Sequence, residues 1–171
     1  IAMQCVEDGL CALDDAVVRF IPELDLADSD RMERVSIRHL LSHSSGIDAG
    51  DFFVDTVDDD DCRARYVDAL SGTDFLFEPG AYFSYCNAGT ILAGRVVEVL
   101  RGAPWEAIVQ ERIIDLLGMC DTTFVPGPSP GADADSARGH LVTPTGLTPL
   151  PWDHIETYTT RAMAPAGGTL V

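Results

Sequence analysis

The chain has 171 residues, of which 46% are hydrophobic, a balance typical of folded globular proteins rather than disordered ones. No apolar run approaches the roughly 20 residues that cross a bilayer, so we expect no transmembrane segment. Acidic residues number 28 against 11 basic ones, and the resulting net charge of −17 repels phosphate groups, so we expect no nucleic-acid partner.

Short apolar stretches punctuated by glycine and proline predict a mostly helical N-terminal part. Residues 1–8 have the pattern of a helix that a following glycine stops. The acidic pair Asp14-Asp15 is placed to cap a short helix that continues through Phe20. The polar and acidic stretch 24–34 is predicted to be a loop.

Two further helices are predicted before residue 72. Ser36 is placed to cap a helix over 37–43. The acidic run 58–61 supplies negative charge to the N-terminus of a helix that ends at Leu70. A calcium-binding loop is the alternative for this run, but Arg63 stands where an EF-hand counted from the first aspartate requires glycine. We therefore predict a solvated helix start.

The clearest helical periodicity lies in the next part of the chain. Residues 91–100 have one apolar face at helical spacing. Pro104 is at a favoured first position of another helix. The expected buried face of that helix consists of Trp105, Ile108, Val109, Ile113, Leu116 and Leu117. Residues 126–135 predict a loop, and 140–150 predict two short strands joined by a turn. The predicted fold class is mostly α with a short β element near 140–150.

Tyr85-Cys86-Asn87 is the candidate site. It follows a turn signal at 77–80, and Asn87 is placed to cap the helix that begins near Ala88. A phenol in such a place can relay protons, and an amide can both donate to and accept from a substrate amide. The alternative from the residues alone is a buried tyrosine beside an ordinary N-cap asparagine.

Metal and cofactor sites are not indicated. His39 and His43 are four residues apart in the predicted helix 37–43, a spacing that can bind zinc, but no metalloprotease pattern or third ligand accompanies them. The five cysteines have irregular spacing and form no Cys-x-x-Cys pair, so neither a zinc site nor a disulfide framework is indicated. We predict two structural histidines near the helix C-terminus, no metal and no cofactor.

Several segments, in this order, resemble the serine β-lactamase-like family, which contains class C β-lactamases, D-alanyl-D-alanine carboxypeptidases and related esterases. The resemblance covers nearly the whole chain. The segments that carry it are Val35–Ile47, Phe77–Gly80, Phe83–Gly89, Leu92–Glu98, Leu117–Thr122 and Ala164–Gly168.

By this resemblance, Tyr85 and Asn87 fall on the family's Tyr-x-Asn motif, which implies a catalytic role for Tyr85 and a substrate-binding role for Asn87. Cys86 between them is a small residue without an evident role. The family's nucleophile belongs to a Ser-x-x-Lys motif, and this chain contains no lysine. We therefore expect that motif to precede Ile1, and the third motif, Lys/His-(Thr/Ser)-Gly, to follow Val171.

The resemblance implies a parent fold with an α/β subdomain and an all-α subdomain, as in β-lactamases and transpeptidases. Residues 1–20 would be the end of the nucleophile-bearing helix and a following short helix, in or bordering the α/β subdomain. Residues 21–135 would form the helical subdomain that carries the Tyr-x-Asn motif. Residues 136–171 would form a small β element and the start of the return to the α/β subdomain. The chain is then an internal fragment.

The activity implied by the resemblance is that of a serine hydrolase that cleaves β-lactam, D-Ala-D-Ala peptide or ester substrates through an acyl-enzyme. The expected partner is a small-molecule or short-peptide substrate, and the fragment alone is predicted to be inactive. One alternative is a non-catalytic penicillin-binding-like module that binds peptide or peptidoglycan, and another is a free-standing helical interaction domain. The family is often extracytoplasmic, and we expect any targeting signal to precede Ile1.

Overall fold

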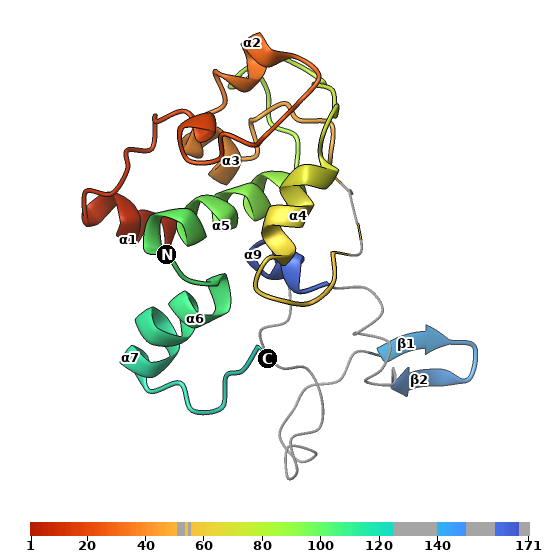
Figure 1. The fold of residues 1–171 in the computed structure, drawn as a ribbon. Helices are drawn as coiled ribbons and strands as arrows, with labels where there is room; N and C mark the ends of the chain where they lie inside the picture. The colour runs from red at the N-terminus through yellow and green to blue at the C-terminus, as the bar shows by residue number, and fades with distance from the viewer. Residues whose placement is uncertain (51–53, 55, 125–139, 150–159, 168–171) are drawn as a thin grey trace.

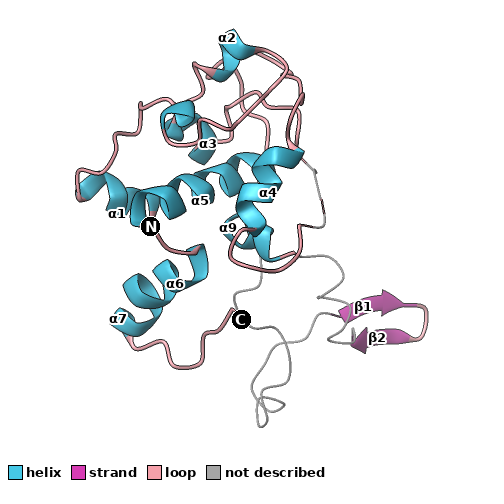
Figure 2. Cartoon of the chain, in the orientation of Figure 1, coloured by secondary structure: helices cyan, strands magenta, loops and turns pink. Residues whose placement is uncertain are grey.

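The computed structural model describes residues 1–50, 54, 56–124, 140–149 and 160–167, and helices predominate within these ranges (Figures 1 and 2). The longest helix among them, α5 (Asn87–Arg101), runs through the middle of the helical part. The helices that contact α5 are α1 (Ala2–Glu7), α3 (Ile37–Leu41), α4 (Cys62–Ala69), α6 (Trp105–Val109) and α9 (Ala164–Gly167). The predicted mostly helical fold is confirmed.

The short helix predicted to continue through Phe20 is a 3-10 helix, η1 (Val17–Arg19), with Phe20 at its C-cap. The predicted cap is wrong, because Ala16 occupies the N-cap position and no side chain caps the helix. The Asp15 carboxylate accepts a hydrogen bond from the Ala12 backbone N–H at 2.9 Å and therefore closes a turn ahead of the helix.

The predicted loop 24–34 contains a short helix, α2 (Ser29–Met32). The helix begins because Asp28 Oδ1 accepts a hydrogen bond from the Arg31 backbone N–H at 2.9 Å and so satisfies a free donor of the first turn. The side chain of Arg31 in turn donates from Nε to Glu78 Oε1 at 2.7 Å. A long-range ion pair thus stabilises a helix that the acidic local sequence does not suggest.

The helix α4 follows the acidic run, as predicted, but the aspartates do more than supply helix-terminal charge. Asp59 forms an ion pair with Arg65, one turn into α4. Asp60 Oδ1 pairs with Arg161 Nη2 at 2.8 Å, although the two residues are 101 positions apart. The run therefore connects α4 to the C-terminal described segment, and within the described residues it forms no metal-binding cluster.

The helix predicted from Pro104 consists of three consecutive parts, which are α6 (Trp105–Val109), a π-helical turn η2 (Gln110–Ile114) and α7 (Asp115–Leu117). The wider π turn rotates the following residues around the helix axis. Ile114 is therefore buried in place of Ile113, while Leu116 and Leu117 are 76% and 69% exposed. The predicted buried face is correct for the first part of the helix and wrong for the last.

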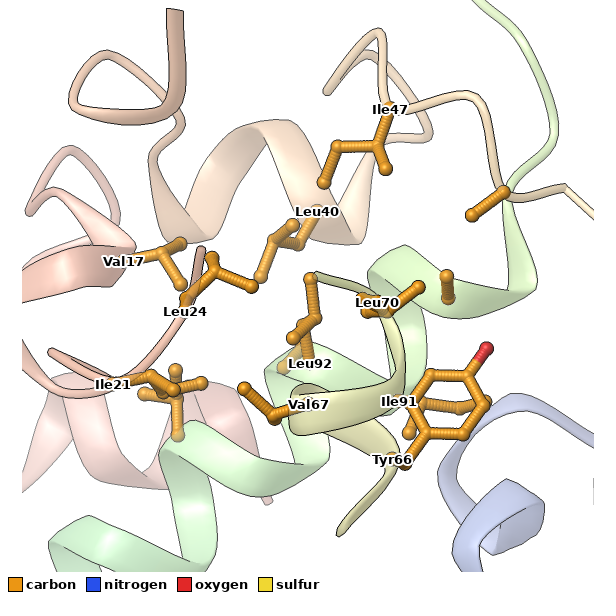
Figure 3. Close-up of a cluster of buried hydrophobic side chains, with 14 of the residues drawn as sticks. Val17, Ile21, Leu24, Leu40, Ile47, Tyr66, Val67, Leu70, Ile91 and Leu92 are labelled. Carbon is orange, nitrogen blue, oxygen red and sulfur yellow. The ribbon is translucent and has the colours of Figure 1, made fainter. Parts of the chain in front are cut away.

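The main core lies between α3, α4, α5 and the turns that precede α3 (Figure 3). It includes Val17, Ile21, Leu24, Leu40, Ile47, Tyr66, Val67, Leu70, Ile91 and Leu92, all buried. Ala88 and Ile91 in the first turn of α5 are fully buried. Packing therefore fixes the position of the α5 N-terminus, immediately after the Tyr-x-Asn motif.

Arg63 of α4 is completely buried and joins segments that are far apart in the sequence. Its Nε donates to Glu98 Oε1 of α5 at 2.7 Å, and its Nη2 donates to Glu106 Oε2 of α6 at 2.6 Å. Its Nη1 donates to the backbone carbonyl of Arg161 at 2.6 Å, at the start of η4 (Arg161–Met163). All three guanidinium nitrogens are satisfied, which a buried charge requires.

The predicted β element is confirmed as an antiparallel hairpin of β1 (His140–Thr143) and β2 (Gly146–Pro149), in which Thr143 pairs with Gly146. The predicted loop at 126–135 lies outside the described residues. Within the described ranges, no helix combines the length and apolar character needed to cross a membrane.

Candidate active site

The loop after α3 and the segment before α5 lie against each other, although 43 residues separate His43 from Cys86 in the sequence. The backbone N–H of Ser84 donates to the His43 carbonyl at 2.8 Å. The backbone N–H of Asn87 donates to the Gly50 carbonyl at 3.2 Å. The loop after α3 therefore supplies hydrogen-bond acceptors to the backbone of the segment before α5.

Gly46 allows the loop after α3 to approach the turn at 77–80 closely. Its backbone φ is +78°, in the left-handed region, and a Cβ atom there would overlap the Phe77 carbonyl. Its own carbonyl accepts a hydrogen bond from the Leu76 backbone N–H at 2.7 Å. Any larger residue at this position would push the loop after α3 away from the turn at 77–80.

The side chain of Tyr85 is 57% exposed and lies beside the loop. Its ring lies over the His43 imidazole, with centroids 4.3 Å apart and planes tilted by 32°. The alternative of a buried core tyrosine is thereby excluded. An accessible phenol held on one side by an aromatic ring is available to exchange a proton with a bound molecule.

Asn87 is the first residue of α5, and Cys86 occupies the N-cap position. This corrects the prediction that Asn87 caps the helix. As the first helical residue, Asn87 donates its N–H to the Gly50 carbonyl instead of capping the helix, and its carbonyl accepts from Thr90 Oγ1 at 2.8 Å. Its side-chain amide makes no hydrogen bond to another described residue.

Cys86 fixes the motif against the core. Its side chain is buried, and its thiol contacts the Ile47 carbonyl at 3.7 Å. Burial raises the pKa of the Cys86 thiol, so it stays protonated as a weak donor. Its backbone N–H donates to His43 Nδ1 at 3.2 Å. A residue without an evident role in the sequence thus holds the two candidate site residues on either side of it.

The two histidines have separate roles. Ser36 Oγ accepts from the His39 backbone N–H, and His39 Nδ1 accepts from the Ser36 N–H, both at 3.3 Å, so that His39 caps the start of α3. Because α3 ends at Leu41, His43 lies beyond the helix. The predicted position of both histidines near the C-terminus of this helix is confirmed, with His39 in its last turn, but the helix ends two residues earlier than predicted. Among the described residues, no group of three or more potential ligands could hold a metal ion.

Two further aromatic side chains that are close to the motif in the sequence are exposed. Phe83 is 72% exposed and meets the His43 ring edge-on at 5.9 Å between centroids. Tyr82 is 69% exposed and packs edge-on against Phe77 at 5.5 Å. Phe83 thus contacts the same imidazole as Tyr85, whereas Tyr82 contacts Phe77. Sequence reasoning treated His43 as a structural histidine and did not place it beside Tyr85, although His43 belongs to the segment Val35–Ile47 that carries the resemblance.

A sequence profile of the family described as Beta-lactamase matches residues 1–170. The chain belongs to the beta-lactamase family. Penicillin-binding protein 4 of Amycolatopsis lactamdurans is 36% identical over 172 residues, covering 100% of this chain and 44% of that protein. Lovastatin esterase of Penicillium rubens is 31% identical over 147 residues, covering 73% of this chain and 36% of that protein.

Solved structures agree with this assignment. The octameric penicillin-binding protein homologue from Pyrococcus abyssi matches this beta-lactamase family chain with a TM-score of 0.68 and 28% identity, covering 98% of this chain and 38% of that one. The resemblance noted in the sequence is confirmed, as is the relation to β-lactamase and transpeptidase folds. The chain spans less than half the length of the curated relatives that it matches, at 44% and 36%.

Proposed function

We propose that this chain contributes Tyr85 and Asn87 to the active site of a serine acyl hydrolase. The observation that carries the proposal is their joint presentation at the start of α5. Tyr85 offers an accessible phenol, and Asn87 offers a side-chain amide that no other described residue binds. Membership of a family that includes a protein named as a penicillin-binding protein and one named as an esterase supports acyl transfer as the chemistry.

The proposed reaction proceeds in two steps through an acyl-enzyme. A serine hydroxyl attacks the substrate carbonyl, its proton passes to the lysine–tyrosine pair, and the leaving group departs with a proton. Water then releases the acyl group by the reverse proton transfers. This chain contains no lysine, so the Ser-x-x-Lys motif belongs to residues outside these 171. We further propose that 21–135 form the helical subdomain, with 1–20 and 136–171 bordering an α/β subdomain.

Each candidate residue has a chemical task in this scheme. Tyr85 transfers a proton to or from the serine oxygen and the leaving group. Asn87 orients the substrate because its amide both donates and accepts, which matches the acyl amide of a β-lactam or a peptide. A carboxylic ester presents the same reacting carbonyl. The proposed substrate class is therefore β-lactam, D-Ala-D-Ala peptide or ester.

The test compares Tyr85→Phe with Tyr82→Phe in the complete protein that contains this chain. Loss of the Tyr85 hydroxyl is expected to lower kcat by about 10²–10⁴, the usual contribution of a positioned acid–base group. Tyr82 is also exposed and serves as the matched control, with little expected change. Turnover of a nitrophenyl ester and of nitrocefin, together with acylation by a fluorescent penicillin, provides the measurements.

Two outcomes would contradict the proposal. Full activity of Tyr85→Phe would remove the phenol from the reaction. Tight binding of a D-Ala-D-Ala peptide without acylation of the complete protein would instead favour the non-catalytic binding module. The 171-residue chain by itself is expected to show no turnover, and measurable nitrocefin hydrolysis by it would contradict the assignment of the nucleophile to other residues.

A further inference from the structure

The contacts of Tyr85 lead to a residue outside the Tyr-x-Asn motif. We infer that His43 is a positioning residue, which holds the Tyr85 ring and the backbone on both sides of it in the geometry for proton transfer. This inference rests on the function proposed above. Three features of His43 carry it: its backbone contacts, its ring contact and its own backbone conformation.

The backbone contacts fix the chain immediately before and after Tyr85. The His43 carbonyl accepts from the Ser84 N–H at 2.8 Å, and its Nδ1 accepts from the Cys86 N–H at 3.2 Å. Because Nδ1 is an acceptor, the neutral ring carries its proton on Nε2. His43 therefore fixes the backbone on both sides of Tyr85. This limits the direction in which the Tyr85 side chain points away from the backbone.

The ring contact restricts the side chain itself. An exposed tyrosine would ordinarily exchange between staggered χ1 rotamers. The His43 ring lies 4.3 Å from the Tyr85 ring, centroid to centroid, and 5.9 Å from the Phe83 ring in a T-shaped arrangement. Because 57% of Tyr85 is exposed, the stacked imidazole is a contact that can hold the phenol in one orientation.

The backbone of His43 is itself in an uncommon conformation. Its φ is +53°, in the left-handed region that residues other than glycine seldom adopt. Such conformations persist where surrounding structure enforces them, and they occur often at functional sites. In this case the left-handed residue lets the loop turn after α3 so that its carbonyl meets Ser84, before Tyr85, and its imidazole meets Cys86, after Tyr85.

The test is a double-mutant cycle between His43→Asn and Tyr85→Phe in the complete protein. Asparagine tolerates the left-handed conformation and keeps an acceptor near the place of Nδ1, but it lacks the ring. His43→Asn is expected to lower kcat on the order of 10-fold to 10²-fold with KM little changed, as for a misplaced reacting group. In the Tyr85→Phe background the same change is expected to have little further effect, because the group it positions is absent.

The control is His39→Asn, since His39 caps α3 and does not stack on Tyr85. Its effect is expected to be the same in both backgrounds, and melting curves of every variant separate unfolding from misplacement. Equal losses from His43→Asn in both backgrounds, or a change in KM alone, would overturn the inference. If Tyr85→Phe kept full activity, the proposed function would fail and this inference with it. If Tyr85→Phe lost activity but His43→Asn kept it, the inference about His43 would fail and the proposed function would stand.

Discussion

At the scale of single residues, Gly46 decides how closely the loop after α3 approaches the turn at 77–80. Gly46→Ala is expected to destabilise the chain for two reasons. A left-handed backbone costs a non-glycine residue about 1–3 kcal/mol, and the added Cβ would overlap the Phe77 carbonyl. Equilibrium urea denaturation measures the change in the free energy of unfolding.

Gly72 provides the matched control for Gly46. Its φ is +74°, nearly the same, but a Cβ there would meet no atom within 4 Å. Gly72→Ala should therefore lose only the backbone term, and Gly46→Ala should be clearly less stable than Gly72→Ala. If both variants lost the same free energy of unfolding, the chain would relieve the overlap between the added Cβ and Phe77 at no cost, contrary to this prediction.

At the scale of elements, α5 and α9 are packed together through Gly94. Alanine normally stabilises a helix interior by about 1 kcal/mol relative to glycine. At Gly94, however, a Cβ would overlap the rigid ring of Pro165, so Gly94→Ala is expected to lower the free energy of unfolding by about 1–3 kcal/mol. Thermal or urea denaturation gives both the sign and the size.

The same helix contains its own control. A Cβ at Gly89 would meet its nearest neighbour, the Leu40 carbonyl oxygen, at 3.5 Å, an ordinary contact. Gly89→Ala is expected to be neutral or stabilising by up to about 1 kcal/mol. A stabilising Gly94→Ala would mean that α9 does not pack on α5 as described.

At the scale of the whole molecule, the buried Arg63 network makes stability depend on pH through Glu106. Burial raises the pKa of Glu106, but hydrogen bonds and charge from Arg63, and a hydrogen bond from Arg161, outweigh burial and hold that pKa below its usual value. A lowered pKa in the folded state stabilises the fold above the unfolded value of about 4.3, and this contribution is lost as the pH falls through the folded value.

Glu106→Gln is therefore expected to be less stable than the unchanged chain at pH 7, by about 3–5 kcal/mol, because Arg63 loses a buried partner. The difference between the two proteins should shrink as the pH falls below about 4.3. Urea denaturation from pH 7 to pH 3.5 measures it. Glu78→Gln, at an exposed carboxylate paired with Arg31, should show a smaller difference. A Glu106→Gln difference that stayed constant with pH would contradict the assigned role of the network.

Local signals in the sequence were sufficient for some elements of the fold. The cap at Ser36, the apolar face of α5 and the turn between β1 and β2 depend on neighbours within a few residues, and the structure confirms all three. The predicted cap at Asp14-Asp15 and the exposed Leu116 and Leu117 show where local patterns fail. Asp15 binds the backbone of an earlier turn instead of capping η1, and an inserted π turn changes which residues of the helix after Pro104 are buried.

For the candidate site, residue order was enough to find the Tyr-x-Asn motif and the family. Three features required the folded chain, namely the exposure of Tyr85, the place of Cys86 rather than Asn87 at the cap, and the contacts of His43 with both neighbours of Tyr85. The physical reason is distance along the chain. Contacts between the loop after α3 and the segment before α5 span 43 positions in the case of His43 and Cys86, and they form only when a shared core brings both segments together.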